Sequence, residues 1–282
     1  MKKALGVGVL ILGLSGFAFS GGFSIRATGG LSLLMGGDYN AYIDNLNSQY
    51  NLSPLFVSQR PERMTQGMTF GGEVLYHFSD AFGIGLGTGF ISASSESTLL
   101  ASLGIFTMTQ TFNPQITAVP LTLNLHYFLP ISSRLNFHAF LGPGLYFSNV
   151  TYGLTIKVPA ELDSILDTFK PEGKAVLGFQ GGLGLELRLN ERVFLVVDAG
   201  GRMVRISGLT GQEEASGIIG GFPLHVVRTS TLWYYEENMA GITAIYLDIE
   251  QSQPSSPLVR NVREGAFSLG GFTFQAGLRI KL

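Results

Sequence analysis

Four histidines are the side chains best suited to acid–base chemistry in this sequence, which contains no cysteine. They are His77, His126, His138 and His225. Hydrolytic catalysis places a histidine beside a serine or an acidic partner. Only His225 is expected in an external loop, near Glu213 and Glu214 in the sequence. No serine motif, metal-ligand spacing or phosphate-binding loop accompanies these residues. The sequence therefore predicts a protein that is not an enzyme and has no metal site and no cofactor.

A second group of chemically interesting side chains is charged and interrupts apolar segments. Its members are Arg26, Glu73, Glu186, Arg188, Asp198, Arg202 and Arg279, with Lys281 as a further candidate. A charge in apolar surroundings costs several kcal/mol unless an opposite charge pairs with it. The elements that position these residues therefore decide what they do.

Side chains alternate in polarity along most of the chain. Between Val119 and Leu129 the odd positions are apolar, whereas the even positions include Thr122, Asn124 and His126. The same period of two runs through residues 68–78, 82–90, 135–147, 177–189 and 272–282. Successive side chains of a strand point to opposite faces, so these segments are predicted to be strands. The second face is small or weakly polar, unlike the charged outer face of a soluble sandwich.

Composition narrows the class of protein further. Only 13% of the 282 residues are charged and 38 are glycine, and the mean hydropathy is +0.29. Beyond the N-terminus there is no run of about 20 apolar residues, which argues against a helical membrane protein. The formal net charge of -2 argues against a basic surface for nucleic acid.

The first twenty residues have the pattern of a secretory signal peptide. Lys2 and Lys3 precede an apolar stretch, and Ala18-Phe19-Ser20 offers small residues at the positions that signal peptidase reads. We expect residues 1–20 to be cleaved, which leaves a mature domain of residues 21–282.

Tight and long connections between the predicted strands alternate strictly. The tight turns lie at 79–81, 130–134 and 190–192, and the long connections at 36–66, 92–115, 151–175 and 207–265. Further strands near 23–35 and 193–206 bring the expected total to eight. Outer-membrane barrels have short periplasmic turns and long external loops, and an open sheet edge cannot lie in hydrocarbon. The prediction is an all-β protein: an eight-stranded antiparallel transmembrane up-and-down β-barrel with long extracellular loops.

Three segments resemble the small outer-membrane β-barrel domain family. Val119–Pro130 (VPLTLNLHYFLP) with Phe137–Phe147 (FHAFLGPGLYF) looks like the middle hairpin of these domains, and Gly277–Leu282 (GLRIKL) resembles their closing strand. The resemblance implies the bacterial outer membrane, lipid and lipopolysaccharide around the wall, and the barrel assembly machinery as a partner during biogenesis. The family includes adhesion proteins, opacity-type antigens, structural anchors and conduits for hydrophobic molecules, so it leaves the function open.

The apolar face of each strand is assigned to lipid, so the charged group points inward. An eight-stranded barrel is only wide enough for its interior side chains, and the charges lie a few residues from tight turns or chain ends. We expect one salt-bridge network in the periplasmic half, with a gated ion path or a carboxylate catalytic site as alternatives. Gly83, Gly85, Gly87 and Gly89 leave room for side chains opposite or for a ligand. Pro143 predicts a bulge or bend, or else a lateral window.

Two loop segments are candidates for contacts. Residues 159–171 are predicted to form a short helix, since four apolar residues follow the spacing of one helix face: Leu162, Ile165, Leu166 and Phe169. The helix would cap the barrel mouth or act as a lid. In the last loop, residues 231–235 and 242–249 are expected to extend the final hairpin. Trp233, Tyr234 and Tyr235 there are expected to meet the lipid headgroups, pack loop on loop, or contact a partner.

Three functions follow from these features. The first is a non-enzymatic, monomeric barrel with a structural role in the envelope or a surface role through its loops, where an extracellular protein would bind. The second is a conduit for small hydrophobic molecules, based on Pro143, the glycines and the loop helix. The third is an envelope enzyme that modifies lipid or cleaves protein, based only on His225 and its nearby acids.

Overall fold

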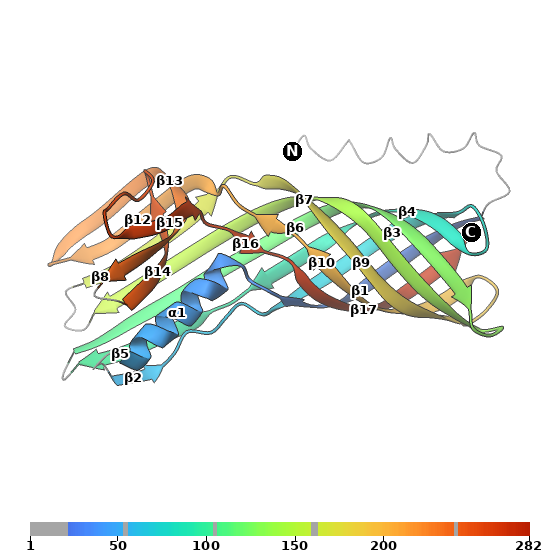
Figure 1. Cartoon of the computed structure of the whole chain (residues 1–282), viewed down its shortest axis with the longest axis horizontal. Helices are drawn as coiled ribbons and strands as arrows, with labels where there is room; N and C mark the ends of the chain where they lie inside the picture. The colour runs from blue at the N-terminus through green and yellow to red at the C-terminus, as the bar shows by residue number, and fades with distance from the viewer. Residues whose placement is uncertain (1–21, 53–55, 104–105, 159–162, 240–241) are drawn as a thin grey trace.

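The computed structural model describes residues 22–52, 56–103, 106–158, 163–239 and 242–282, so the signal-peptide prediction for residues 1–20 lies outside the described part. The described residues form one helix and seventeen strands, and every strand pairing is antiparallel. The expected total of eight strands is therefore wrong. The additional strands arise because the long connections are themselves folded into sheet (Figure 1).

Eight long strands pair in a ring. Starting from the first strand, each pairs with the next, and the last pairs again with the first. In ring order they are β1 (Gly22–Leu34), β3 (Gln66–His77), β4 (Phe82–Ser94), β6 (Phe106–Pro130), β7 (Leu135–Val158), β9 (Lys174–Arg188), β10 (Val193–Met203) and β17 (Gly271–Lys281).

Both described chain ends and the three tight turns lie at one end of the ring, which we call the short-turn end. The opposite, extended end carries the remaining elements. They are α1 (Asp38–Leu52), β2 (Phe56–Gln59), β5 (Ser97–Leu103), β8 (Asp163–Pro171), β11 (Arg205–Ile206), β12 (Thr210–Ile219), β13 (Phe222–Met239), β14 (Ile242–Glu250), β15 (Val259–Glu264) and β16 (Phe267–Ser268).

The alternating sequence separates the two faces of the ring. On β6, Leu123 and Leu125 are 49% and 54% exposed on the outer face, whereas Asn124 and His126 between and beside them are 4% and 1% exposed. This follows from the period of two of a strand, which sends neighbouring side chains to opposite faces. The outer face is almost entirely apolar, and the inner face carries the polar groups.

Two prolines interrupt the pairing of β6 without shifting it. Opposite Pro143 and Gly142 of β7 the ladder skips Leu123 and Asn124 and then resumes in the same register. Around Pro120 the pairing with β4 skips in the same way between Leu121 and Ala118. A proline cannot donate to the ladder, so the interruption is local. The bulge predicted at Pro143 is absent, because a bulge would shift the register.

The extended end has an apolar core in which α1 is central. Tyr39 and Ile43 of this helix are fully buried and pack in one cluster with β-strand residues such as Phe112, Phe169 and Phe267. The apolar positions of α1 recur at helical spacing, which explains why this stretch forms a helix. Within the described residues no helix is long and apolar enough to span a membrane.

The helix predicted at 159–171 is wrong for its described part, because residues 163–171 form β8. This strand pairs with β7 on one side and β12 on the other. The hydrogen bonds of two ladders stabilise this segment as a strand, whereas a short isolated helix is only marginally stable. Residues 231–235 and 242–249 do pair as strands, but they join the sheet through β12 and β8, not through the final hairpin of β10 and β17.

Asp38 anchors the start of α1 to a distant part of the chain. Its carboxylate accepts hydrogen bonds from the Arg263 guanidinium, at 2.8 Å for Nη2, and from the backbone N–H of Ala266 at 2.9 Å. Asp38→Ala should therefore loosen α1. In detergent micelles we expect trypsin to cleave several-fold faster after the exposed Arg63, measured by mass spectrometry. Asp80→Asn at the short-turn end is the control, and unchanged cleavage in Asp38→Ala would contradict the anchoring role.

Candidate functional site

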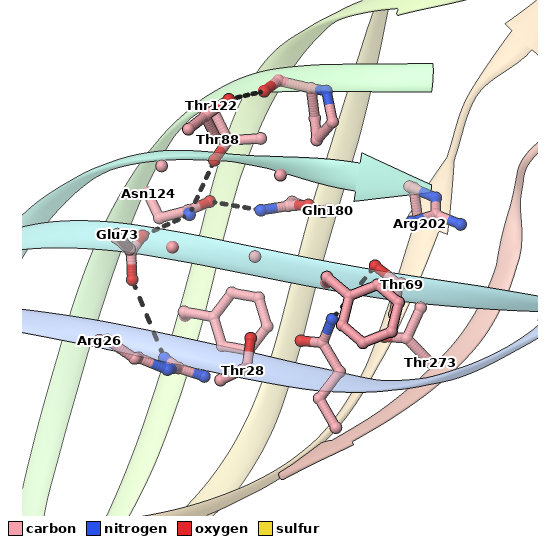
Figure 2. Close-up of a pocket in the computed structure, with 18 of the residues that line it drawn as sticks. Arg26, Thr28, Thr69, Glu73, Thr88, Thr122, Asn124, Gln180, Arg202 and Thr273 are labelled. Carbon is pink, nitrogen blue, oxygen red and sulfur yellow. Dashed lines mark hydrogen bonds and ion pairs between the residues drawn. The ribbon is translucent and has the colours of Figure 1, made fainter. Parts of the chain in front are cut away.

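The interior of the ring is the candidate site, because the polar side chains gather there. Inward positions on four of the ring strands bring together Arg26 of β1, Glu73 of β3, Asn124 of β6 and Gln180 of β9 (Figure 2). Arg26 lies directly opposite Glu73 across the ladder of β1 and β3. Arg26 also lies opposite Arg279 across the ladder of β1 and β17. Acids from further strands must therefore balance two adjacent cations.

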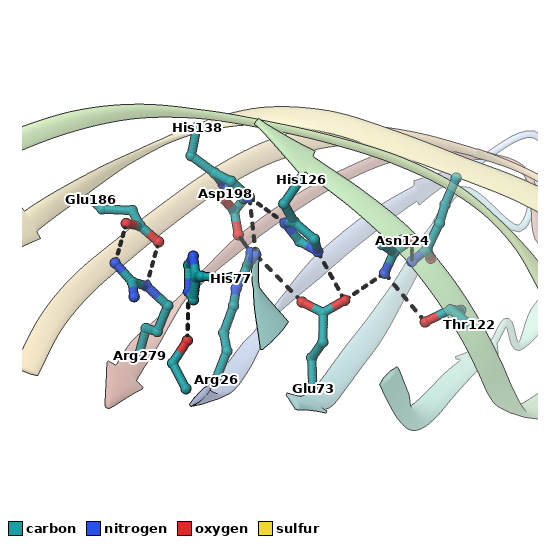
Figure 3. Close-up of polar contacts among 12 residues, drawn as sticks. Arg26, Glu73, His77, Thr122, Asn124, His126, His138, Glu186, Asp198 and Arg279 are labelled. Carbon is teal, nitrogen blue, oxygen red and sulfur yellow. Dashed lines mark hydrogen bonds and ion pairs between the residues drawn. The ribbon is translucent and has the colours of Figure 1, made fainter. Parts of the chain in front are cut away.

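Two arginines and three acids form the ion pairs near the short-turn end (Figure 3). Arg279 binds Glu186 through two hydrogen bonds, of 2.9 Å from Nε and 2.7 Å from Nη2. Arg26 pairs with Asp198 and, at 3.9 Å, with Glu73. All five side chains are at most 10% exposed. We call these residues, together with His126 and His138, the ion network.

The two histidines connect the acids at opposite sides of the ion network. His126 Nε2 lies 3.1 Å from Glu73 Oε1, and His126 Nδ1 lies 2.8 Å from His138 Nε2. His138 Nδ1 lies 3.3 Å from Asp198 Oδ1. One of the two imidazoles must donate the hydrogen between them, so their tautomers are coupled. His138 Nδ1 makes no hydrogen bond to any described residue, so the hydrogen bonds extend from Glu73 through His126 to His138 and stop short of Asp198.

Aromatic rings fill the space around the ion network. The rings of His126, His138, Phe128 and Phe140 stack at centroid distances of 5.1–6.0 Å. The Arg279 guanidinium lies 4.1 Å from the centroid of Phe194. Such contacts favour a cation in an apolar setting. Packing and charge together leave little free space at this height.

Glycines provide the room for these side chains. A Cβ on Gly85 would lie 2.9 Å from His126 Nε2 and would overlap the Glu73 carboxylate. A Cβ on Gly182 would lie 2.8 Å from the Phe140 ring, and one on Gly178 would lie 2.9 Å from the Tyr146 ring. The inner glycines therefore act in packing, as predicted: without a Cβ they leave room for large side chains that include Phe140 and Tyr146.

A cavity of about 90 Å³ lies next to the ion network, on the side of the extended end. Asn124 donates to Glu73 at 2.7 Å and accepts from Gln180 at 3.1 Å, and Gln180 accepts from the Tyr146 hydroxyl at 3.2 Å. The remaining lining is rich in threonine hydroxyls and includes Arg202. Figure 2 shows this polar lining. A polar cavity of this size is wetted or filled by a polar solute.

Two of the seven charged residues predicted to form the ion network are elsewhere, and so is the further candidate Lys281. Arg188 is exposed beside the turn at the short-turn end, with its Cζ 5.9 Å from the Phe194 ring, and Lys281 is also exposed. Arg202 is buried, but it lies on the far side of the cavity and has no carboxylate partner among the described residues. The ion network therefore holds five of the seven predicted charges.

The sequence reasoning missed His126 and His138, although a signal for both exists. Each lies at an inward position of its alternating segment, between apolar residues that point outward. The same alternation identifies Asn124 and Gln180. The nearness of the two histidines to Glu73 and Asp198 could not be read from the sequence, because it depends on which strands face one another across the interior.

The predicted loop-contact residues are mostly packed against other loops. Tyr234 is 8% exposed and lies under the Arg263 guanidinium at 3.9 Å, and Tyr235 stacks on Tyr246. Trp233 is half-buried. On β8, Phe169 is fully buried, Ile165 is half-buried and Leu166 is exposed, whereas Leu162 lies outside the described residues.

No described group of histidines and acids has the arrangement of a metal site. His225 is exposed on β13, and Glu213 instead binds Arg228 and Ser230, at 2.6–2.7 Å and 2.5 Å. Ser24 and His77 form a pair at 2.9 Å. In the described part of the chain, no carboxylate hydrogen bonds to His77, so the third member of a hydrolytic triad is lacking.

The sequence matches the family described as "Outer membrane protein beta-barrel domain" over residues 14–216. The chain belongs to this family. This outer-membrane β-barrel protein therefore resides in the bacterial outer membrane. Among solved structures, it is similar to the outer membrane protein OprG from Pseudomonas aeruginosa, with 13% sequence identity and a TM-score of 0.37, over 93% of this chain and 96% of that chain. No curated protein gives a significant match.

The ion pair of Glu186 and Arg279 generates a stability prediction for the barrel. Glu186→Ala leaves a buried guanidinium without its carboxylate, and breaking a buried pair costs about 3–5 kcal/mol. We expect a correspondingly lower free energy of unfolding in urea, followed in micelles by circular dichroism. Glu191→Ala, at an exposed turn position, is the control. A loss in Glu186→Ala no greater than in this control would show that the pair is dispensable.

A second prediction concerns pH and the extended end of the barrel protein. Burial, together with the Glu213 carboxylate, raises the pKa of Asp167 to about 6. The folded state then binds this proton more tightly than the unfolded state, so stability falls as pH rises from about 4 to about 6 and stays lower above that range. Asp167→Asn removes this dependence.

The single tryptophan, Trp233, reports on this region through its fluorescence. Asp167→Asn should resist urea better than the unmodified protein at pH 8, and the two should converge near pH 4. Asp80→Asn should change neither curve. Equal urea midpoints at pH 8 would contradict the raised pKa.

Proposed function

We propose that this protein is a non-enzymatic, monomeric outer-membrane barrel with a blocked bore, which serves the envelope through its structure and its folded extracellular end. In this proposal the eight ring strands form the closed wall in the membrane. The short-turn end faces the periplasm, and the extended end faces the exterior. Lipid and lipopolysaccharide surround the wall, and the barrel assembly machinery inserts it.

The dimensions and outer surface of the ring support a membrane location for these strands. The shorter ring strands have 11–13 residues, and a tilted transmembrane strand needs about 9–11. Their outward side chains are exposed and apolar. Phe78, Phe82 and Tyr127 are exposed near the short-turn end, where interfacial aromatic residues are typical of such barrels.

The observation that carries the proposal is a bore that is occupied at two heights. The ion network and its aromatic rings occupy the short-turn half, and the apolar cluster around α1 occupies the extended end. A path for ions would have to cross both. The absence of an acid beside His77 and the isolation of His225, within the described residues, support a non-enzymatic role.

Planar lipid bilayers test the blocked bore. We expect purified protein to insert without steady conductance steps at neutral pH. Phe140→Ala should remain closed, because the ion pairs and the apolar cluster are still present. Steady steps in the unmodified protein would overturn the proposal.

The conduit for small hydrophobic molecules is the second candidate, favoured by the two interruptions that flank β6 at Pro120 and Pro143. These breaks weaken the wall beside the cavity, whose lining includes Pro120 and Gly89. Uptake of a hydrophobic dye by intact cells distinguishes the candidates. A conduit predicts faster uptake on expression, reduced by Pro143→Ala, whereas the blocked barrel predicts no change in either case.

A further inference from the structure

Arg202 is a buried cation without an acidic partner. It is 6% exposed, and its Nε donates to the backbone oxygen of Leu269 at 2.9 Å. Its Nη2 lies 3.5 Å from the Ser32 hydroxyl, and its Nη1 has no hydrogen-bond partner among the described residues. The nearest acid along its own strand, Asp198, is four residues away, about 13 Å along a strand, and is paired with Arg26.

The Arg202 side chain lines the cavity together with hydroxyl groups from neighbouring strands. Thr69 accepts a hydrogen bond from Gln275 Nε2 at 3.3 Å, which leaves its own hydroxyl hydrogen available. Thr28 and Thr273 line the same cavity, and their hydroxyls make no hydrogen bond to described residues. Thr273 lies opposite Ser32 on β1, close to Arg202 on the adjoining β10 (Figure 2). These groups are donors facing one space.

The opposite wall of the cavity does not neutralise Arg202. Glu73 lines that wall, but it is engaged by Arg26, His126 and Asn124. A buried charge without a counter-ion costs several kcal/mol, and a guanidinium with hydroxyl donors around it suits an oxyanion. Glu73 would repel an anion from its own side, so the anion would lie at the Arg202 side.

We propose that the cavity is a binding site for one small oxyanion, of the size of phosphate or smaller, held by Arg202 with Thr69 and Thr273. The bound anion would supply the missing negative charge and complete the filling of the bore. This site goes beyond the proposed structural and surface role, and it neither requires nor excludes a conduit.

Crystals soaked in sodium selenate test the site directly, because selenium gives an anomalous signal. We expect one peak in the cavity beside the Arg202 guanidinium, absent in Arg202→Gln and retained in Arg188→Gln, which removes an exposed arginine. A parallel soak in sodium bromide separates oxyanions from halides. A bromide peak without a selenate peak, or only water in both soaks, would overturn the proposal.

Solution measurements guard against binding at crystal concentration only. In micelles, replacing sodium gluconate by sodium phosphate at constant ionic strength should raise the urea midpoint saturably, since gluconate is too large for a cavity of about 90 Å³. Arg188→Gln should keep this rise and Arg202→Gln should lose it. If Arg202→Gln fails to fold, the double substitution Thr69→Val with Thr273→Val, which keeps the cation, should need at least tenfold more phosphate. An equal rise in all variants, or none in the unmodified protein, would overturn the site.

Discussion

Two cations, Arg26 on the first strand and Arg279 on the last, lie directly opposite each other, and the arrangement of the interior depends on this constraint. Like charges directly opposite each other destabilise a ladder, yet the register of β1 and β17 puts these two side by side. Glu73, Glu186 and Asp198, from three further strands, neutralise them. The seam between the chain's two ends is therefore electrostatically balanced only when all five strands are in place. Closure of the sheet between β1 and β17 thus places both arginines beside these acids.

The narrowness of the interior explains where glycine occurs. An eight-membered ring has room only for its own side chains, and here these include three arginines, two histidines and several large aromatics. Gly85 and Gly182 lie where a Cβ would collide with His126 and Phe140. Glycine inside a strand lowers stability, but at these positions it permits the buried contacts. The glycine content of the sequence thus follows from the size of the groups it must enclose.

The period of two predicted which side chains point inward, because that depends only on local geometry. It could not predict their partners, so His126 and His138 were missed. The prediction failed for Arg188 because this residue is the last of β9 and lies exposed beside the turn that follows. Arg202 is inward as expected, but too far along β10 to reach an acid. The long connections were misjudged because β12, β13 and β14 pair one after another and reach the ring only through β8, which pairs with β12 and β7. The helix α1 had only its apolar spacing as a signal.

The connections at the extended end form one folded unit. Asp38, in the first long connection, binds Arg263, which lies 225 residues later in the last one. Loops that merely join strands open at little cost, whereas these share an apolar core with α1. A partner that bound here would meet a surface already ordered and would not have to pay the entropy of folding it. In the proposed function the same core also blocks the bore above the polar cavity. The order of the outer surface and the proposed blockage would then have a common cause, so a change that loosens α1 should affect both together.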